Sequence, residues 1–296
     1  MLSSPRGFCA GVVRAVEVVE ICLEKFGPPV YVKHQIVHNP HVVKDLEAKG
    51  ARTVETVEEV PPGSTVVFSA HGSPPEDFEK AKKRGLRVID AVCPLVTRVH
   101  NEAKKYHREG KQVLLVGHRG HQEVRGTMGQ VDMTLVDDTP GSALPQWPKG
   151  VEVAVLTQTT LSVGDTAQAI EAIKERYSGA LVRNDICYAT TNRQEAVTKM
   201  ASLVDMVLVI GAQNSSNCNR LREVAESHGV PSYLVNGPEE IDPQWLAGKE
   251  KVGITSGAST PEVLVEQVIQ ALAPEQVTML NGAEEDVAFT LPKELR

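Results

Sequence analysis

The chain has 296 residues, of which 41% are hydrophobic and 23% are charged, and its formal net charge at pH 7 is −7. This composition is typical of a soluble globular protein with more than one domain, and the charge excludes a general basic surface for nucleic acid. No stretch approaches the roughly 20 apolar residues of a membrane span. The first residues form no apolar signal segment, so we expect a cytoplasmic protein that binds neither membrane nor nucleic acid.

Short β-rich runs alternate with helical patterns along the chain, which predicts an α/β fold with mostly parallel sheets. In the first third, a glycine-rich loop at 5–11 leads into an apolar helical pattern, and strands are expected at 30–33, 65–69 and 88–92. Helices are expected at 39–49 and from Ser73 onward, where the sequence S-P-P-E forms a capping box with proline in the first turn.

The middle and last thirds repeat this alternation. Strands are expected at 112–117, 151–156, 206–211 and 251–255, and helices at 162–177 and 259–273. Residues 275–296 are expected to form a strand-bearing tail that packs back on the body. Most strands end in a small polar cluster where a helix begins. In open α/β sheets ligands bind beyond the carboxyl ends of the strands, and helix N-termini there bind anions such as phosphate.

Three of the five cysteines occupy the same kind of position, where a loop or strand leads into a helical pattern. They are Cys9, Cys93 and Cys187, spaced 84 and 94 residues apart, and each is followed by an arginine at a similar offset (Arg14, Arg98 and Arg193). This recurrence predicts three related α/β domains. Their expected limits are 1–92, with the tail 275–296 packing back, then 93–186 and 187–274.

Taken singly, each of these cysteines can be a small buried hydrophobe, although the positive end of a helix dipole favours a thiolate at such a position. The recurrence of the arrangement makes the three of them candidate metal ligands. Five cysteines without close pairs argue against a secreted disulfide scaffold. Three convergent thiolates outside that context predict a soft metal centre. Cys22 lies inside the first apolar helix and Cys218 follows a polar turn, and both are expected to be buried side chains.

Polar side chains near the strand ends are candidates for an anion site. They are His38, His71, His121, Ser215, Ser216, Asn217 and Ser259. Taken singly, each histidine can equally be a surface or hydrogen-bonding residue, and each serine a helix N-cap. Glu123 lies in a glycine-rich turn and is a candidate general acid, to which Thr159 could add a hydroxyl; the alternatives are a solvated carboxylate and a helix cap. The sequence has no dinucleotide fingerprint, P-loop, CxxC pair or ferredoxin run.

Long motifs follow one another in a fixed order. They are P-R-G-F-C-A-G-V at 5–12, V-H-N at 37–39, F-S-A-H-G at 68–72, D-A-V-C-P-L-V at 90–96, G-H-x-G-H-x-E-V-x-G-T-M-G-Q at 117–130, T-Q-T-T-L-S-V at 157–163, D-I-C-Y-A-T-T-N-R-Q-E-A at 185–196, N-S-S-N at 214–217 and S-G-A-S at 256–259. On these motifs the chain resembles the 4-hydroxy-3-methylbut-2-enyl diphosphate reductase (IspH/LytB) family over nearly its whole length.

The resemblance implies a trefoil of three α/β domains around one central 4Fe–4S cluster. Cys9, Cys93 and Cys187 match its three protein ligands, which leaves one iron open. The family's diphosphate ligands match His38, His71, His121, Ser215, Ser216, Asn217 and Ser259. Glu123 and Thr159 match the groups near the substrate hydroxyl, with Glu123 on the path of proton delivery.

The implied reaction is a reductive dehydroxylation. Two electrons and two protons convert 4-hydroxy-3-methylbut-2-enyl diphosphate to isopentenyl and dimethylallyl diphosphate plus water, which is the last step of the non-mevalonate isoprenoid pathway. The open iron would act as a Lewis acid on the hydroxyl, and Glu123 would supply a proton. A ferredoxin- or flavodoxin-type protein would supply electrons to a monomer or weak homodimer.

Three other functions stay open on the residues alone. A zinc hydrolase with Glu123 as its base would be colourless and hold stoichiometric zinc. A metal-free sugar-phosphate-binding module or isomerase would keep its ligand affinity when Cys9 is replaced by serine. An iron–sulfur sensor would hold a cluster without turnover. The three matched cysteines and the turn that carries Glu123 favour the reductase.

Overall fold

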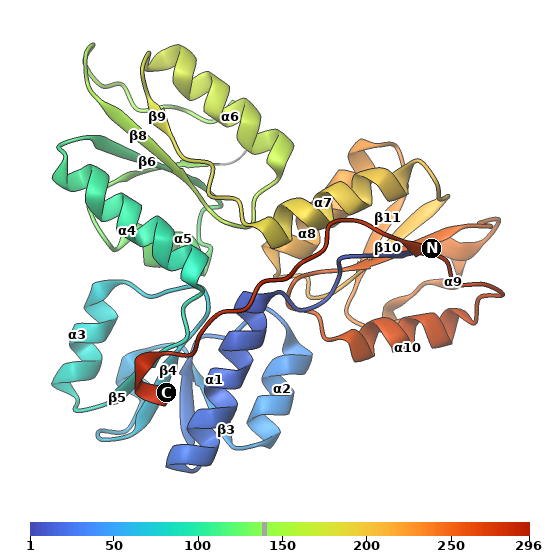
Figure 1. Cartoon of the computed structure of the whole chain (residues 1–296), viewed down its shortest axis with the longest axis horizontal. Helices are drawn as coiled ribbons and strands as arrows, with labels where there is room; N and C mark the ends of the chain where they lie inside the picture. The colour runs from blue at the N-terminus through green and yellow to red at the C-terminus, as the bar shows by residue number, and fades with distance from the viewer. Residues whose placement is uncertain (138–140) are drawn as a thin grey trace. The chain divides into compact units, whose positions relative to one another are not determined.

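A computed structural model of the chain describes residues 1–137 and 141–296. The chain divides into two compact units. Unit 1 comprises Met1–Val12, His38–Val42 and Tyr188–Ala288, and unit 2 comprises Val13–Val37, Val43–Cys187 and Phe289–Arg296. Figure 1 labels most of the helices and strands named below.

Unit 1 is built on a five-stranded parallel sheet in the order β11-β10-β12-β1-β13. Its strands are β1 (Leu2–Ser3), β10 (Met206–Ile210), β11 (Ser232–Val235), β12 (Val252–Ser256) and β13 (Met279–Leu280). Its helices are α7 (Tyr188–Ala201), α8 (Ser216–Ser227), α9 (Pro243–Leu246) and α10 (Glu262–Leu272), with a 3₁₀ turn η2 (Pro238–Glu240).

The strand β10 is an unbroken apolar run because both of its faces are buried. Met206, Leu208 and Ile210 belong to the core that α10 contributes to. Val207 and Val209 point to the opposite face and belong to the core formed with α7 and α8. This alternation follows from the two-residue repeat of a β-strand, and it explains why the strand is easily recognised in the sequence.

Unit 2 holds two four-stranded parallel sheets. The first has the order β3-β2-β4-β5, with β2 (Val30–Lys33), β3 (Ala51–Val54), β4 (Thr65–Phe68) and β5 (Arg87–Asp90). The second has the order β7-β6-β8-β9, with β6 (Gln112–Gly117), β7 (Thr134–Asp137), β8 (Val153–Thr157) and β9 (Leu181–Val182).

The helices that alternate with these strands are α1 (Ala10–Phe26), α2 (Pro40–Ala48), α3 (Pro75–Lys83), α4 (Pro94–Arg108), α5 (Gln122–Met128) and α6 (Val163–Arg176), with 3₁₀ turns η1 (Val57–Glu59) and η3 (Lys293–Leu295). In the second sheet, Val113 and Leu115 share a core with α4 and α5. Leu114 and Val116 share the opposite core with α6. Of the helices that the structure describes, none combines the length and apolar composition that a membrane crossing needs.

The predicted α/β fold with parallel sheets is confirmed. Each expected strand is present, with its ends shifted by no more than two residues. The strands β3, β7, β9 and β11 are additional to the expected set, and each has two to four residues. β1 pairs with both β12 and β13, so the first and last strands of the chain lie in the sheet of unit 1. The division into three domains stays a prediction.

Candidate active site

The centre of the candidate site in unit 2 is the buried carboxyl group of Glu123. Helix α5 carries Glu123 in its first turn, and the residue is only 4% exposed, which excludes a solvated carboxylate. Thr159, just after β8, donates its backbone N–H to one carboxyl oxygen at 2.7 Å and its hydroxyl to the other at 2.8 Å. Burial raises the pKa of Glu123 to about 7, although the two bonds from Thr159 lower it. Such a group carries a proton near neutral pH and can donate it.

Two histidines lie close together in the same unit. His121 is the N-cap of α5, and its Nδ1 accepts a hydrogen bond from the backbone N–H of Glu123 at 3.2 Å. The ring proton of the neutral side chain is therefore on Nε2. The ring of His71, which follows β4, lies 5.8 Å from that of His121, centroid to centroid, at an interplanar angle of 85°. Both histidines follow strand ends, where an anion site is expected.

Tight backbone packing brings these two histidines together. A Cβ atom on Gly126 of α5 would lie 2.7 Å from the carbonyl oxygen of Gly72, and one on Gly129 would collide with Pro74. Gln130 adds a hydrogen bond from its Nε2 to the carbonyl of Ser73 at 3.1 Å. Because only glycine permits such close approach, the repeated glycines of the motif at 117–130 set the distance between α5 and the loop that follows β4.

Cys93 and Cys187 lie in unit 2, and each directly precedes a helix, as the sequence predicts. Cys93 is the N-cap of α4, and its backbone N–H donates to the carbonyl of Ala70 at 3.0 Å. Cys187 directly precedes α7, and its N–H donates to the carbonyl of Thr159 at 3.0 Å. Both cysteines are partly exposed. Their backbones are thus bonded to loops that contain His71 and Thr159, two candidate substrate ligands.

Cys9 lies in unit 1, directly before α1, and is also partly exposed. Its backbone N–H donates to the carbonyl of Ala258 at 3.2 Å. Two residues earlier, Gly7 has a φ of +67°, and its N–H donates to the hydroxyl of Ser256 at 2.8 Å. The loop that presents Cys9 is therefore fixed to the segment that follows β12.

The other candidate ligands of unit 1 lie at the carboxyl ends of the paired strands β10 and β12. Ser215 is the N-cap of α8, and Ser216 is the first residue of that helix. Asn217 is 5% exposed and accepts a hydrogen bond from the N–H of Ala258 at 3.0 Å. Ser259 donates its hydroxyl to the backbone carbonyl of His38 at 3.1 Å. The fold thus gathers the polar residues that the sequence predicts for this unit.

The remaining cysteines are buried, as expected, and burial raises the pKa of both, that of Cys22 to about 11. None of the five cysteines, all of them in the described part of the chain, forms a disulfide. Among residues 1–137 and 141–296, no three His, Cys, Asp or Glu side chains form a preassembled metal site. Because Cys9 belongs to unit 1 and Cys93 and Cys187 to unit 2, their joint role as metal ligands stays a prediction.

Two buried polar residues are additional to the predicted set. Asp185, 2% exposed, accepts hydrogen bonds from the N–H of Thr157 and from Arg98, both at 3.4 Å, and burial raises its pKa to about 6. Gln158, 1% exposed, accepts from the N–H of His118 at 2.9 Å and so joins the loops after β6 and β8. Their signal in the sequence is a polar residue in or directly after an apolar run, just before a candidate ligand.

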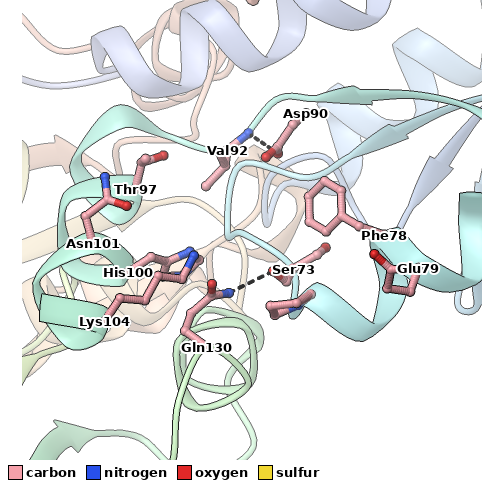
Figure 2. A pocket seen from close by; sticks show the side chains of 11 residues that line it. Ser73, Phe78, Glu79, Asp90, Val92, Thr97, His100, Asn101, Lys104 and Gln130 are labelled. Carbon is pink, nitrogen blue, oxygen red and sulfur yellow. Dashed lines mark hydrogen bonds between the residues drawn. The ribbon is translucent and has the colours of Figure 1, made fainter. Parts of the chain in front are cut away.

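A cavity of about 300 Å³ borders this site in unit 2. Figure 2 shows side chains of α4 on one side of it and Phe78 and Glu79 of α3 on the other. Burial raises the pKa of Asp90 to about 6 and lowers that of His100 to about 4. His100 packs so closely on Gly72 that a Cβ atom there would lie 2.7 Å from its ring. The cavity wall therefore supports the loop that carries His71.

The sequence profile of the LytB protein family matches residues 1–273. The chain belongs to the LytB family. It is 54% identical over 302 residues to 4-hydroxy-3-methylbut-2-enyl diphosphate reductase 1 of Rhodopseudomonas palustris, with 99% of this chain and 98% of that protein covered. It is 52% identical over 303 residues to the enzyme of that name from an Azoarcus species, with 100% and 97% covered.

A solved LytB-type structure has the same fold. The E-1-hydroxy-2-methyl-but-2-enyl-4-diphosphate reductase of Plasmodium falciparum is 37% identical and superposes with a TM-score of 0.95, covering 99% of this chain and 95% of that one. These comparisons confirm the family that the sequence motifs indicate.

Proposed function

We propose that this LytB protein is a cytoplasmic 4-hydroxy-3-methylbut-2-enyl diphosphate reductase. In the proposed reaction the carbon–oxygen bond of the allylic alcohol breaks, the hydroxyl leaves as water, and a new carbon–hydrogen bond forms. Two electrons and two protons are consumed, and isopentenyl and dimethylallyl diphosphate are the products. The observation that carries the proposal is the buried Glu123, whose raised pKa provides a proton for the leaving hydroxyl.

The proton has a short route out of the carboxyl group. When Glu123 is protonated, it can donate to the hydroxyl of Thr159, 2.8 Å away, and that hydroxyl can then donate to the oxygen of the substrate. The second bond, from the backbone N–H of Thr159, holds the carboxyl group in one orientation. Hydroxide is a poor leaving group, so protonation of this oxygen makes the departure of water feasible.

The diphosphate would be bound by histidine, hydroxyl and amide groups rather than by a patch of lysines and arginines. The Nε2–H of His121 and the ring of His71 are offered from unit 2. In unit 1, the donors are the N-terminus of α8 with Ser215, Ser216 and Asn217, together with Ser259 and His38. Fixing the diphosphate in this way would limit the positions open to the allylic hydroxyl.

The donor set of the chain fits an iron–sulfur cluster. Cys9, Cys93 and Cys187 are the partly exposed cysteines, and each lies where helix N–H groups favour a thiolate, whereas the two remaining cysteines are fully buried. When bound, one 4Fe–4S cluster with three thiolate ligands supplies single electrons and an iron with an open coordination position. The proposed electron donor is a ferredoxin- or flavodoxin-type protein, and the proposed state is a monomer or weak homodimer.

The first test is iron and acid-labile sulfide per chain, measured on protein purified without oxygen. We expect about four of each, and loss of most iron in Cys9→Ser, Cys93→Ser and Cys187→Ser. Cys218→Ala is the matched control and should keep its iron, because Cys218 is buried between Gly211 and Gly257. A colourless chain that holds zinc, or no metal after reconstitution, would refute the proposal.

The second test is turnover of Glu123→Gln with reduced viologen and the diphosphate. The amide keeps an oxygen to accept from the N–H of Thr159 and an NH₂ to donate to its hydroxyl, so substrate binding and iron content should stay unchanged. It holds no transferable proton, and turnover should fall by roughly 10²- to 10⁴-fold, the usual contribution of a general acid. If Glu123→Gln turns over at the wild-type rate, Glu123 has no part in the mechanism. If the wild-type chain holds a cluster but shows no turnover, the protein is an iron–sulfur sensor rather than a reductase.

A further inference from the structure

We propose that three arginines are positioning residues, and that each one holds the segment in front of the next cysteine along the chain, two through a backbone carbonyl and one through a carboxylate, rather than the cysteine of its own helix. The three are Arg14, Arg98 and Arg193, which follow Cys9, Cys93 and Cys187 respectively. The inference rests on the proposed function for the role of the cysteines, but the contacts that carry it lie within single units of the structure.

Arg193 acts on the loop of Cys9. It lies on α7, which follows Cys187, and its side chain is 0% exposed. Its Nη2 donates to the carbonyl of Gly7 at 2.9 Å, two residues before Cys9. Its Nη1 donates to the carboxylate of Glu285 and to the carbonyl of Ala189 on its own helix, both at 2.9 Å, and Ala189 lies after Cys187 rather than in front of it. Gly7 is the residue of positive φ at which this loop bends, so the arginine holds the loop at its turning point.

Arg14 makes the corresponding contact for Cys93. It lies on α1, which follows Cys9, and it is 8% exposed. Its Nη1 donates to the carbonyl of Val92 at 2.9 Å, and Val92 directly precedes Cys93. Its Nε donates to the carbonyl of Thr290 at 2.8 Å. If the guanidinium were removed, each of the two carbonyls would be left away from water without its charged hydrogen-bond donor, which costs free energy. The buried side chain therefore fixes both segments.

Arg98 completes the set with the weakest contact. It lies on α4, which follows Cys93, and its Nη2 lies 3.4 Å from the carboxylate of Asp185, two residues before Cys187. The side chain of Arg98 is 52% exposed, whereas that of Asp185 is 2% exposed. Solvent therefore weakens this pair. Asp185 is also held by a hydrogen bond from its own N–H to the hydroxyl of Thr157 at 2.8 Å.

The order of the contacts is cyclic. The arginine after the first cysteine holds the second, the arginine after the second holds the third, and the arginine after the third holds the first. The C-terminal tail supports two of these arginines, through Glu285 and the carbonyl of Thr290. A guanidinium suits this task because its planar fork can bind two partners at once, which a lysine ammonium does with less geometric control.

The experiment measures hydrogen exchange at the three cysteine amides in the full-length chain before any iron is loaded. Each amide has a partner that the structure identifies: Ala258 for Cys9, Ala70 for Cys93 and Thr159 for Cys187. In Arg193→Met we expect exchange at Cys9 alone to accelerate about tenfold, which corresponds to about 1.4 kcal/mol of local opening. Arg14→Met should do the same at Cys93 alone.

Arg98→Met should accelerate exchange at Cys187 by less than about threefold, since its contact is long and exposed. The lysine variants should give intermediate values. Because Arg193→Met leaves the partly buried Glu285 without its cation, Glu285→Gln is the second variant, and it should also act on Cys9 alone. Arg222→Met on α8, an arginine 35% exposed that pairs with Glu226, is the matched control and should leave all three amides unchanged.

Three results would overturn the proposal. They are faster exchange at the cysteine of the arginine's own helix, equal acceleration at all three cysteines, and no change at any of them. Iron binding by the wild-type chain is measured separately. If that chain binds no iron, the proposed function fails, while the exchange pattern still decides whether the arginines position the three loops.

Discussion

The buried carboxyl of Glu123 should make the stability of unit 2 depend on pH. Its pKa is raised from the ordinary 4.5 to about 7 by burial. Below pH 4.5 the group is protonated in both the native and the unfolded state and has no effect. As pH rises from 4.5 to 7, the unfolded chain loses the proton that the native state keeps, so the native state is progressively disfavoured.

The size of this effect follows from the two pKa values. Their separation of about 2.5 corresponds to about 3 kcal/mol, reached above pH 7. In Glu123→Gln the amide does not titrate and keeps both partners on Thr159. The variant should therefore match the wild type near pH 4.5 and exceed it by up to about 3 kcal/mol at pH 8. The other titrating groups are common to both proteins, so they cancel in the difference.

Urea unfolding can follow unit 2 by itself because the chain has one tryptophan in each unit, Trp147 in unit 2 and Trp245 in unit 1. In a Trp245→Phe background, the fluorescence of Trp147, which packs on Tyr177, reports unit 2. A difference between Glu123→Gln and the wild type that stays constant from pH 4.5 to pH 8 would refute the reasoning. So would a carboxyl pKa near 4.5 for Glu123 in a ¹³C NMR titration.

Two further substitutions test the packing of unit 2. Gly126→Ala would place a methyl group 2.7 Å from the carbonyl oxygen of Gly72. We therefore expect urea unfolding to show a loss of about 1–3 kcal/mol in unfolding free energy, and calorimetric titration to show weaker diphosphate binding. An unchanged affinity would show that the histidine spacing does not depend on this contact. Asp77→Asn would leave the ammonium of Lys33, 7% exposed, without its carboxylate and should cost about 3–5 kcal/mol; a urea midpoint equal to that of the wild type would contradict this.

Most of the strands that the sequence predicts are buried on both faces. Val113–Val116 and Met206–Ile210 are continuous apolar runs, and this pattern is independent of the rest of the chain. The strands that it does not predict are short or partly exposed. β3 alternates between buried ends and a solvent-facing Arg52, and neither of the two residues of β9 is fully buried. Only the assembled sheet determines such strands.

For the candidate site, the sequence predicts which residues are present but not how they are buried. The glycine-rich turn around Glu123 is compatible with a solvated carboxylate, and the turn alone does not show that the carboxyl is buried against Thr159, 36 residues further along the chain. Gln158 and Asp185 are missed for the same reason. Each lies in or next to a recognisable motif, but its function as a connection between loops depends on the side-by-side placement of β6 and β8.

Thr159 links the two chemical functions that the site would need. Its N–H and hydroxyl bind the two oxygens of Glu123, and its carbonyl accepts the N–H of Cys187. All three bonds involve one residue, which lies two positions after β8. A shift of the Cys187 loop would move the carbonyl of Thr159 and with it the donors that lower the pKa of Glu123. The protonation of the acid and the placement of this cysteine are therefore coupled through a single residue.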